Sequence, residues 1–423
     1  MKRFHYAWIV LLLSFFALLS AQGVRLSFGA FIQPWEQEFS ADRAAVSLIA
    51  LVSYLVYAVS GPVVGKVVDQ YGVRKVLSAS ILIVGVSTLI SFMVTSTWQL
   101  IILYGVISSI GFGGASNVVT SVMITQWFYA KRGLALGLMA AGSGAGQFLI
   151  VPASLFMIDE WGWKITVVTW GVFLCLVVLP LVLWFIRTSP ADLGMKAYGE
   201  EEDKEENIEA KEKPPEMEKE QLPFSVMIRS RAFWFIAFPF FVCGVSTTGL
   251  MDTHLIPYAQ MCGFATGATS LAVSLLAGFN ILGTALSGHF ADRWNHRYML
   301  GYIYIIRALT VVLLIYSQDV FLLLVFSVLF GLVDFATVAP TMMLVSEQFK
   351  RYSAGVVFGW VYFSHQLGSA VGAYVPGVIY RLQGGYNTVF WFTAGLLVVA
   401  SILSFTLSKG EDIRQDGSLQ EAI

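Results

Sequence analysis

The sequence predicts an all-α membrane protein with twelve transmembrane helices in two pseudo-symmetric six-helix bundles. Hydrophobic residues make up 57% of the 423 residues and charged residues only 13%, about half the charged share of soluble domains. The apolar residues fall into segments of about 20 or more, the length that crosses a bilayer as a helix. Matched residues also recur at a constant offset of 223 positions, which is typical of an internal repeat.

Each apolar segment is bounded by a short polar break, and we expect one helix per segment. The expected helices of the first half cover approximately 6–34, 44–68, 76–94, 98–127, 133–157 and 163–187. Those of the second half cover approximately 233–258, 268–291, 299–317, 320–345, 354–380 and 387–408. The basic start and small-residue end of the first segment also suit a signal peptide. Because its apolar residues continue to Pro34, we interpret it as the first span.

The Lys and Arg residues predict the orientation. With the N-terminus inside, 21 of the 26 lie on the cytoplasmic side, Arg43, Lys164 and Arg381 lie outside, and Arg25 and Arg307 lie within spans. Positive residues favour the cytoplasmic side of a membrane. We therefore expect a multi-pass protein of a bacterial plasma (inner) membrane with both termini in the cytoplasm.

The long polar break at 188–232 separates the two halves. It contains "GEEEDKEENIEAKEKPPEMEKEQ", which cannot bury enough apolar surface to fold alone. We expect an N-terminal bundle over 1–187, a cytoplasmic linker over 188–232, and a C-terminal bundle with a short cytoplasmic tail over 233–423. The pairs at the constant offset are Pro34 and Pro257, Gly65 and Gly288, Asp69 and Asp292, Arg74 and Arg297, and Gly162 and Gly385. Transporters built from parallel repeats place substrate at the midplane between the halves.

Several classes of function lack support in the sequence. The three cysteines, Cys175, Cys243 and Cys262, are odd in number and lie in or beside apolar segments, so they indicate no disulfide framework and no metal site. No phosphate-binding glycine and lysine signature is present, and no basic surface suggests nucleic acid. We expect no enzyme activity and no cofactor.

Two matched loops resemble a known family. "GKVVDQYGVRK" and "GHFADRWNHR" each follow the second span of their half, and both resemble the loop signature of the major facilitator superfamily. The resemblance implies a cytoplasmic latch that breaks when the halves rock; the alternative is that these are only positive-inside loop charges. The latch residues would be Gly65, Asp69, Arg74, Gly288, Asp292, Arg293 and Arg297.

A second stretch narrows the resemblance. "WFYAKRGLALGLMAAGSGAG", Trp127 to Gly146, is similar to the fourth-loop and fifth-helix signature of the monocarboxylate transporter and oxalate/formate antiporter group. Its small residues would let the fifth helix pack closely on a neighbour, with Lys131 and Arg132 holding its cytoplasmic end. Thr284 stands where that group usually has an eighth-helix arginine, and Ile107 where many proton-coupled members have a fourth-helix arginine. The group's usual anion anchor is therefore missing.

Arg25 is the candidate to replace that anchor. A charge at the centre of a bilayer costs roughly 2.5–3.5 kcal/mol on insertion scales, so it needs a partner or a function. Gln22 and Gly29 share its helix face. The offset places Thr248 opposite Arg25, with Asp252 one turn further on. Two interpretations remain open: Arg25 binds a substrate carboxylate, or it forms a structural ion pair with Asp252.

Three residues are candidates for coupling to a proton: His254, Asp252 and Asp334. An imidazole ordinarily titrates near neutral pH, and we favour His254, although a structural histidine explains it about as well. Arg307 and Asp334 are expected to form a mainly structural couple in the ninth and tenth helices, in which Asp334 could still titrate.

The remaining polar residues within spans are expected to complete a mostly apolar binding site. They are Asn117, Gln147, Asn280, His365 and Gln366. Each alone could equally be interhelical glue. As a set, with Arg25, Gln22 and His254, they suit a small organic anion better than a sugar.

The sequence therefore predicts a secondary carrier that moves a monocarboxylate-like anion by alternating access, coupled to a proton or other ion, functional as a monomer in the lipid bilayer. An exporter of an amphipathic compound is the alternative, favoured by the 14% aromatic content. A receptor or sensor on a carrier fold would need a sizeable soluble module, which the linker is too polar to form.

Overall fold

The computed structural model describes residues 5–200, 224–291, 293–349 and 354–407. These residues are almost entirely helical and contain no strand, only an isolated bridge between Phe128 and Tyr198. The chain divides into two compact units: Met1–Lys213 with Ala259–Ala277, and Pro214–Tyr258 with Gly278–Ile423. The expected bundle boundaries and the linker at 188–232 stay predictions, and 201–223 lies outside the described residues.

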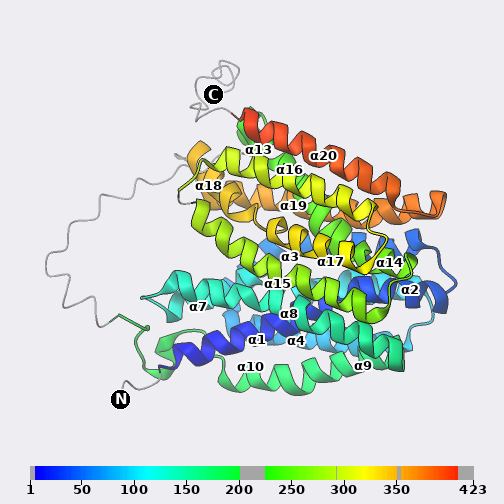
Figure 1. Ribbon diagram of the computed structural model, residues 1–423. Coiled ribbons are helices and arrows are strands. Elements are labelled where there is room, and N and C mark those ends of the chain that lie inside the picture. Colours follow the sequence, from blue (N-terminus) through cyan, green and yellow to red (C-terminus); the bar gives the residue numbers. More distant parts are fainter. Residues whose placement is uncertain (1–4, 201–223, 292, 350–353, 408–423) are drawn as a thin grey trace. The chain divides into compact units, whose positions relative to one another are not determined.

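The first unit holds the six expected N-terminal spans, coloured blue to green in Figure 1. Several are interrupted by π-helical or non-helical turns, a feature often found at functional sites. The helices are α1 (Ala7–Leu26), α2 (Phe28–Glu38), α3 (Arg43–Tyr71), α4 (Val73–Ile90), η1 (Ser91–Met93), α5 (Thr97–Leu100), η2 (Ile101–Ser108), α6 (Ser109–Gly114), α7 (Asn117–Trp127), α8 (Arg132–Trp161), α9 (Trp163–Phe173), η3 (Leu174–Val178), α10 (Leu179–Phe185) and η4 (Pro190–Leu193).

The second half of the chain holds the other six spans. They are formed by α13 (Arg231–Gly244), η6 (Val245–Met251), α14 (Asp252–Met261), α15 (Thr266–Ala291), α16 (His296–Ile315), α17 (Val320–Val333), α18 (Val338–Gln348), α19 (Ala354–Gln383) and α20 (Asn387–Thr406), preceded by the short α12 (Phe224–Met227). The tenth span is split at residues 334–337, between α17 and α18, just as the fourth is split between α6 and α7.

Among the described residues, eleven helices are long and apolar enough to cross a membrane. The remaining expected span is α19, whose 30 residues are long enough to cross; its middle carries His365 and Gln366, which lower its hydropathy. Each span lies within four residues of its expected bounds, because hydropathy alone locates a membrane helix.

The first span ends four residues later than the expected bound. It does not stop at Pro34, because α2 continues to Glu38 with the proline inside it. Arg25 therefore lies 13 residues from the end of the span, about 20 Å along the helix axis. The guanidinium therefore lies well inside the span.

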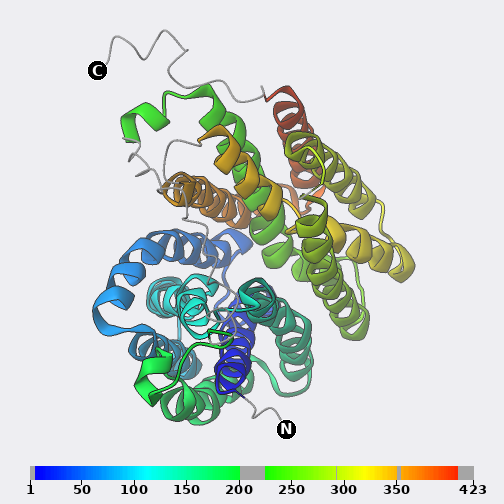
Figure 2. The ribbon, with the colours of Figure 1, turned by 90° about the vertical axis from the view of Figure 1, so that its left-hand side faces the viewer.

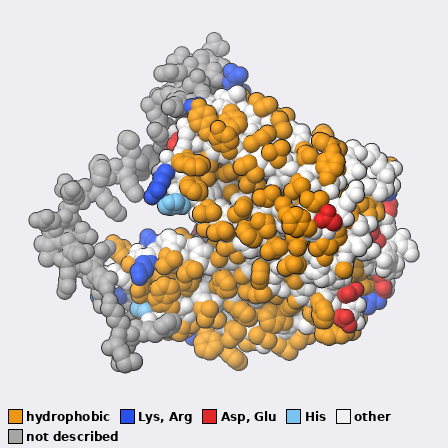
Figure 3. All heavy atoms as spheres, viewed as in Figure 1, with side chains coloured by type: hydrophobic (Ala, Val, Ile, Leu, Met, Phe, Trp, Pro, Cys, Tyr) orange, Lys and Arg blue, Asp and Glu red, His pale blue; other side chains and the backbone are white. Residues whose placement is uncertain are grey.

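The outer surface of the helices suits contact with lipid. In Figure 3 hydrophobic side chains cover much of the face shown, and charged side chains gather near the ends of the helices. Large apolar side chains such as Phe321 and Leu12 are 73% and 66% exposed. An apolar surface of this extent marks contact with a membrane or another protein, and together with the spans it indicates a multi-pass membrane protein.

The small residues of the fifth span allow close packing on a neighbour, as the sequence predicted, and that neighbour is the first span. In Figure 2 the helices of the first unit are seen nearly end-on, with dark-blue α1 beside blue-green α8. Gly142 and Gly146 of α8 face the backbone of α1, and a Cβ added at Gly142 would lie 2.6 Å from the Phe15 carbonyl oxygen. Glycines Gly368 and Gly372 of α19 face α13 and η6 in the same way.

Gly142→Ala should therefore destabilise the protein by roughly 1–3 kcal/mol, the usual cost of overpacking. The expected readout is a lower thermal unfolding temperature in detergent. Gly137→Ala is the matched control on the same helix, because its Cβ would meet nothing within 4 Å. Equal unfolding temperatures for the two variants would contradict the close approach of α1 and α8.

Candidate functional site

Arg25 lies in the last turn of α1, within a frame of aromatic rings from the same unit. Its guanidinium carbon is 4.1 Å from the centroid of the Tyr57 ring and 5.3 Å from that of Tyr54. Its Nη1 donates to Gln22 Oε1 at 3.3 Å, and its carbonyl accepts from the Tyr104 hydroxyl at 2.8 Å. The side chain is half-buried. Cation–π contacts stabilise a guanidinium that has been taken out of bulk water.

Gln22 has a second role at the break in the fourth span. Its Nε2 donates to the Ala115 carbonyl at 2.7 Å and to the Phe112 carbonyl at 3.4 Å. These carbonyls lie where α6 ends, so the usual helical partners are missing there. One buried amide thus satisfies the helix break and also orients Arg25.

The other two polar candidates of the first unit, Asn117 and Gln147, lie in different environments. Asn117 is exposed at the start of α7, and its Oδ1 accepts from the Ser143 hydroxyl at 3.4 Å. Gln147 of α8 is buried. Gln22 is the predicted site residue whose side chain hydrogen-bonds to the Arg25 guanidinium.

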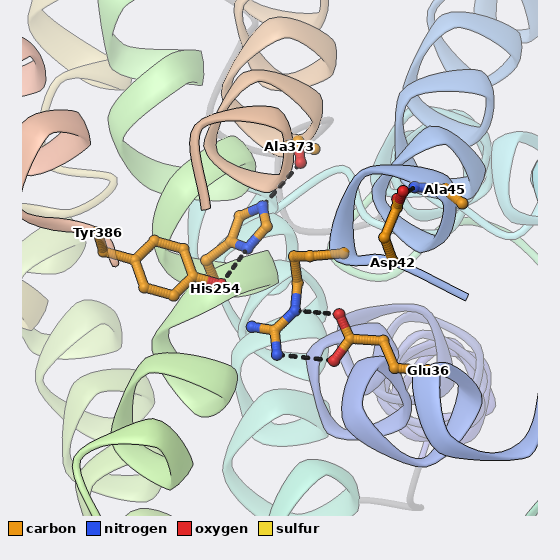
Figure 4. A network of polar contacts seen from close by, with 7 residues as sticks. Glu36, Asp42, Ala45, His254, Ala373 and Tyr386 are labelled. Carbon is orange, nitrogen blue, oxygen red and sulfur yellow. Dashed lines mark hydrogen bonds and ion pairs between the residues drawn. The ribbon is translucent and has the colours of Figure 1, made fainter. Parts of the chain in front are cut away.

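His254 is buried in α14 and held at both ring nitrogens (Figure 4). Its Nε2 lies 2.7 Å from the Ala373 carbonyl oxygen and its Nδ1 lies 3.0 Å from the Tyr386 hydroxyl. A carbonyl only accepts, so Nε2 carries a proton and Nδ1 can accept from the tyrosine. These are the contacts expected of the structural alternative, and they leave the neutral ring satisfied.

Figure 4 also shows an ion pair of the first unit, in which the bidentate carboxylate of Glu36 in α2 meets the guanidinium of Arg43. Arg43 Nη2 donates to Glu36 Oε2 at 2.7 Å. Beside it, Asp42 Oδ1 accepts from the Ala45 backbone N–H at 2.8 Å and caps the start of α3. These contacts join the ends of the first two spans.

A buried polar cluster lies inside the second unit. Arg307 of α16 is fully buried, and its Nη2 donates to the carbonyls of Val333 and Asp334 at the end of α17. Its Nη1 lies 3.2 Å from Cys243 Sγ and 3.4 Å from Ser246 Oγ.

The Asp334 carboxylate is only partly satisfied. Its Oδ2 accepts from Asn280 Nδ2 at 2.9 Å, and Asn280 Oδ1 accepts from Thr284 at 3.2 Å. Its Oδ1 is buried without a hydrogen bond. The predicted couple of Arg307 and Asp334 does meet, but through the backbone carbonyl of Asp334 rather than its carboxylate.

His365 and Gln366 lie next to each other in the middle of α19, with His365 Nδ1 3.2 Å from Gln366 Oε1. Both are buried. The His365 ring stacks on Tyr362 with a centroid distance of 5.8 Å, and its Nε2 has no hydrogen bond. Asp252, half-buried, is the first residue of α14.

The arginines of the predicted latch repeat one contact in both halves. Arg74 donates to the Leu183 carbonyl near the end of α10, and Arg297 donates to the Leu407 carbonyl after α20 at 2.8 Å. A cation at a helix C-terminus is favourable, so each arginine holds the last span of its own half.

The other predicted latch residues lie mostly at the surface. Asp69 is exposed in the last turn of α3, Gly65 and Gly288 are half-buried, and Arg293 is exposed. Asp292 lies outside the described residues.

Sequence reasoning missed the aromatic frame of Arg25 and the thiol beside Arg307. Tyr54 and Tyr57 stand three residues apart and so share a face of α3, a signal that helical spacing could have shown. Cys243 gives no such signal, because nothing in the sequence indicates that it meets Arg307.

Comparisons with known proteins agree with this architecture. The family model of the Major Facilitator Superfamily matches residues 10–373 and, in an overlapping second match, residues 263–421. The uncharacterized MFS-type transporter YcxA of Bacillus subtilis is 26% identical over 408 residues, which cover 94% of this chain and 92% of the relative. Monocarboxylate transporter 12 of Mus musculus is 22% identical over 417 residues, covering 94% and 84%.

A solved structure is similar over nearly the whole chain. The crystal structure of a bacterial homolog of the human lysosomal transporter Spinster, inward-facing and unoccupied, matches with a TM-score of 0.73 and 15% identity. The match covers 96% of this chain and 97% of that one. At this identity the likeness shows the fold.

Proposed function

The chain belongs to the Major Facilitator Superfamily, a family of transporters rather than enzymes, and on that premise we propose that it moves a small organic anion of the monocarboxylate class together with a proton. Transport by alternating access is the mode expected of two repeated bundles. The distribution of Lys and Arg supports a plasma-membrane protein with both termini in the cytoplasm.

The proposal rests on the restricted position of the Arg25 guanidinium. Two tyrosine rings and Gln22 restrict its position deep in the first span. A planar guanidinium fixed in this way matches a carboxylate with two parallel hydrogen bonds, and little side-chain entropy is lost on binding. The similarity to monocarboxylate transporter 12 supports the same substrate class.

The remaining candidates are proposed to make secondary contacts with the substrate. They are Asn117, Gln147, His254, Asn280, His365 and Gln366. Of these, His254 and Asn280 already have partners within the second unit. They position helices first, and each would contact substrate only after a rearrangement. Arg25 and Gln22 therefore form the core of the proposed site.

The test is uptake of labelled carboxylates into proteoliposomes, with and without a pH gradient. We expect at least one short monocarboxylate to accumulate when the outside is acidic, and not after the gradient is collapsed. Failure of every carboxylate, with gradient-driven export of an amphipathic dye instead, would favour the exporter alternative, to which the aromatic content also points.

The candidates for proton coupling are His254, Asp252 and Asp334. Of these, His254 is expected to have a structural role, because both of its ring nitrogens already have partners. His254→Gln can keep one contact and cannot titrate, so we expect it to retain gradient-driven accumulation with reduced thermal stability. Tyr386→Phe, which removes one of the two partners, should lower stability similarly. Exchange at equal pH without any accumulation in His254→Gln would instead identify the imidazole as the coupling group.

A further inference from the structure

Arg307 and Asp334 form a buried couple in the second half of the molecule. The equivalent positions of the first half are occupied by uncharged residues. The offset of 223 residues relates Arg307 to Val84 and Asp334 to Gly111. In the first unit these two residues also meet, since a Cβ added at Gly111 would lie 2.7 Å from Val84 Cγ2. The same helix pair is thus packed once with apolar residues and once with a guanidinium and a carboxyl.

Helix capping does not explain the charge either. The break in the fourth span exposes carbonyls that the neutral amide of Gln22 satisfies. The break in the tenth span is satisfied by Arg307, which reaches the carbonyls of Val333 and Asp334. Because a buried charge is costly and apolar replacements are often neutral or stabilising, a cation at this second break needs a further reason.

The Arg307 guanidinium and the Asp334 carboxyl are adjacent but do not form an ion pair. Asp334 Oδ2 has one hydrogen bond, from Asn280, and Oδ1 has none, while Arg307 Nε also lacks a partner. An ionised carboxylate buried with one hydrogen bond would be strongly unfavourable. This arrangement therefore suits a neutral, protonated Asp334.

From this geometry we propose that Asp334 is the proton-binding site of the second unit and that Arg307 is its positioning residue. With the proton bound, the guanidinium stays on the carbonyls of Val333 and Asp334. When the proton leaves to water, the carboxylate attracts the guanidinium, which then gives up those carbonyls and changes the break between α17 and α18. Proton occupancy would thus select between two arrangements of a discontinuous helix.

Other ionisable groups surround this site in the second unit. Asp252 of α14, Cys243 of α13 and Arg307 of α16 interact electrostatically with Asp334. Tyr304 of α16 and His365 of α19 interact with Cys243. α15 contributes the neutral Asn280. Asp252 is the nearest rival for the proton, because it is the other carboxyl in this group.

The inference rests on the proposed proton coupling, but its first test requires no substrate. Infrared difference spectra of the full chain in liposomes, recorded between two pH values, should contain the C=O stretching band of a protonated buried carboxyl. We expect Asp334→Asn to lose this band and Asp252→Asn to retain it. A band unchanged in Asp334→Asn, or lost only in Asp252→Asn, would overturn the assignment.

Two further variants complete the test: Arg307→Gln and the conservative change Asp334→Glu. In Arg307→Gln the carboxylate loses the cation that would stabilise it, so the band should persist to a pH at least about one unit higher; a merely structural arginine would leave that pH unchanged. Should Asp334→Asn fail to fold, Asp334→Glu decides, since the band must then shift in frequency. An unshifted band in folded Asp334→Glu would refute the proposal.

Transport assays distinguish a failure of this inference from a failure of the proposed function. For whichever labelled monocarboxylate the wild type takes up, Asp334→Asn should exchange it across equal pH but not accumulate it along a pH gradient. Accumulation equal to that of the wild type would overturn the role of Asp334 and leave carboxylate transport standing. If no carboxylate is transported by the wild type, the proposed function fails, and the infrared spectra still decide whether Asp334 binds a proton.

Discussion

Arg25→Lys should lose most of its affinity for the transported carboxylate, although it keeps the positive charge. Lysine cannot reproduce the planar fork of arginine or its stacking on Tyr57. Losing one charge-assisted hydrogen bond of about 1.5–3 kcal/mol corresponds to roughly 10- to 100-fold weaker binding. The measurement is equilibrium binding in detergent, and Arg187→Lys, at the end of the first half, is the control that should bind like the wild type.

The structural alternative for Arg25 makes a different forecast. If Arg25 serves only to pair with Asp252, Arg25→Ala should destabilise the fold by leaving a half-buried carboxylate uncompensated, and the double variant with Asp252→Ala should regain stability and transport. If Arg25 is the anchor, the double variant can be stable but will not bind carboxylates. Thermal unfolding and binding of both single variants and the double variant distinguish the two, and restored transport in the double variant would exclude the anchor.

Asp69→Asn should greatly reduce the transport rate while changing carboxylate affinity by only a few-fold. Asp69 is exposed at the end of α3. It lies 12 residues, or about 18 Å along the helix axis, from Tyr57, which contacts Arg25, so its charge can bias the conformational equilibrium without contacting the substrate. Initial rates in proteoliposomes and binding in detergent measure the two effects separately. Asp159→Asn, an exposed carboxylate near the end of α8, is the matched control.

Complete loss of binding in folded Asp69→Asn would contradict the latch, because a latch acts on the populations of states and not on the site. An unchanged rate would leave Asp69 as an ordinary loop charge. The equivalent Asp292→Asn is expected to behave like Asp69→Asn, as the repeat predicts.

The spans and their repetition could be predicted from the sequence for a local reason. Lipid offers no hydrogen bonds, so each crossing segment must satisfy its backbone as a helix, and its length and hydropathy reveal it. The expected bounds accordingly agree with the helices to within a few residues, even for α19, whose centre is polar. The glycines of α8 were likewise recognisable, because small residues at helical spacing allow close packing whichever neighbour they meet.

The arrangement of polar groups was decided only by the tertiary structure. Hydropathy could not show that α2 continues past Pro34, that Gln22 satisfies the carbonyls of a broken helix, or that Tyr57 lies under Arg25. It suggested that Arg307 and Asp334 belong together, yet it could not show that the guanidinium binds the backbone and leaves the carboxylate without it. The physical reason is that a helix forms from contacts within its own segment, whereas the partner of a buried charge depends on how distant segments are rotated and packed against each other.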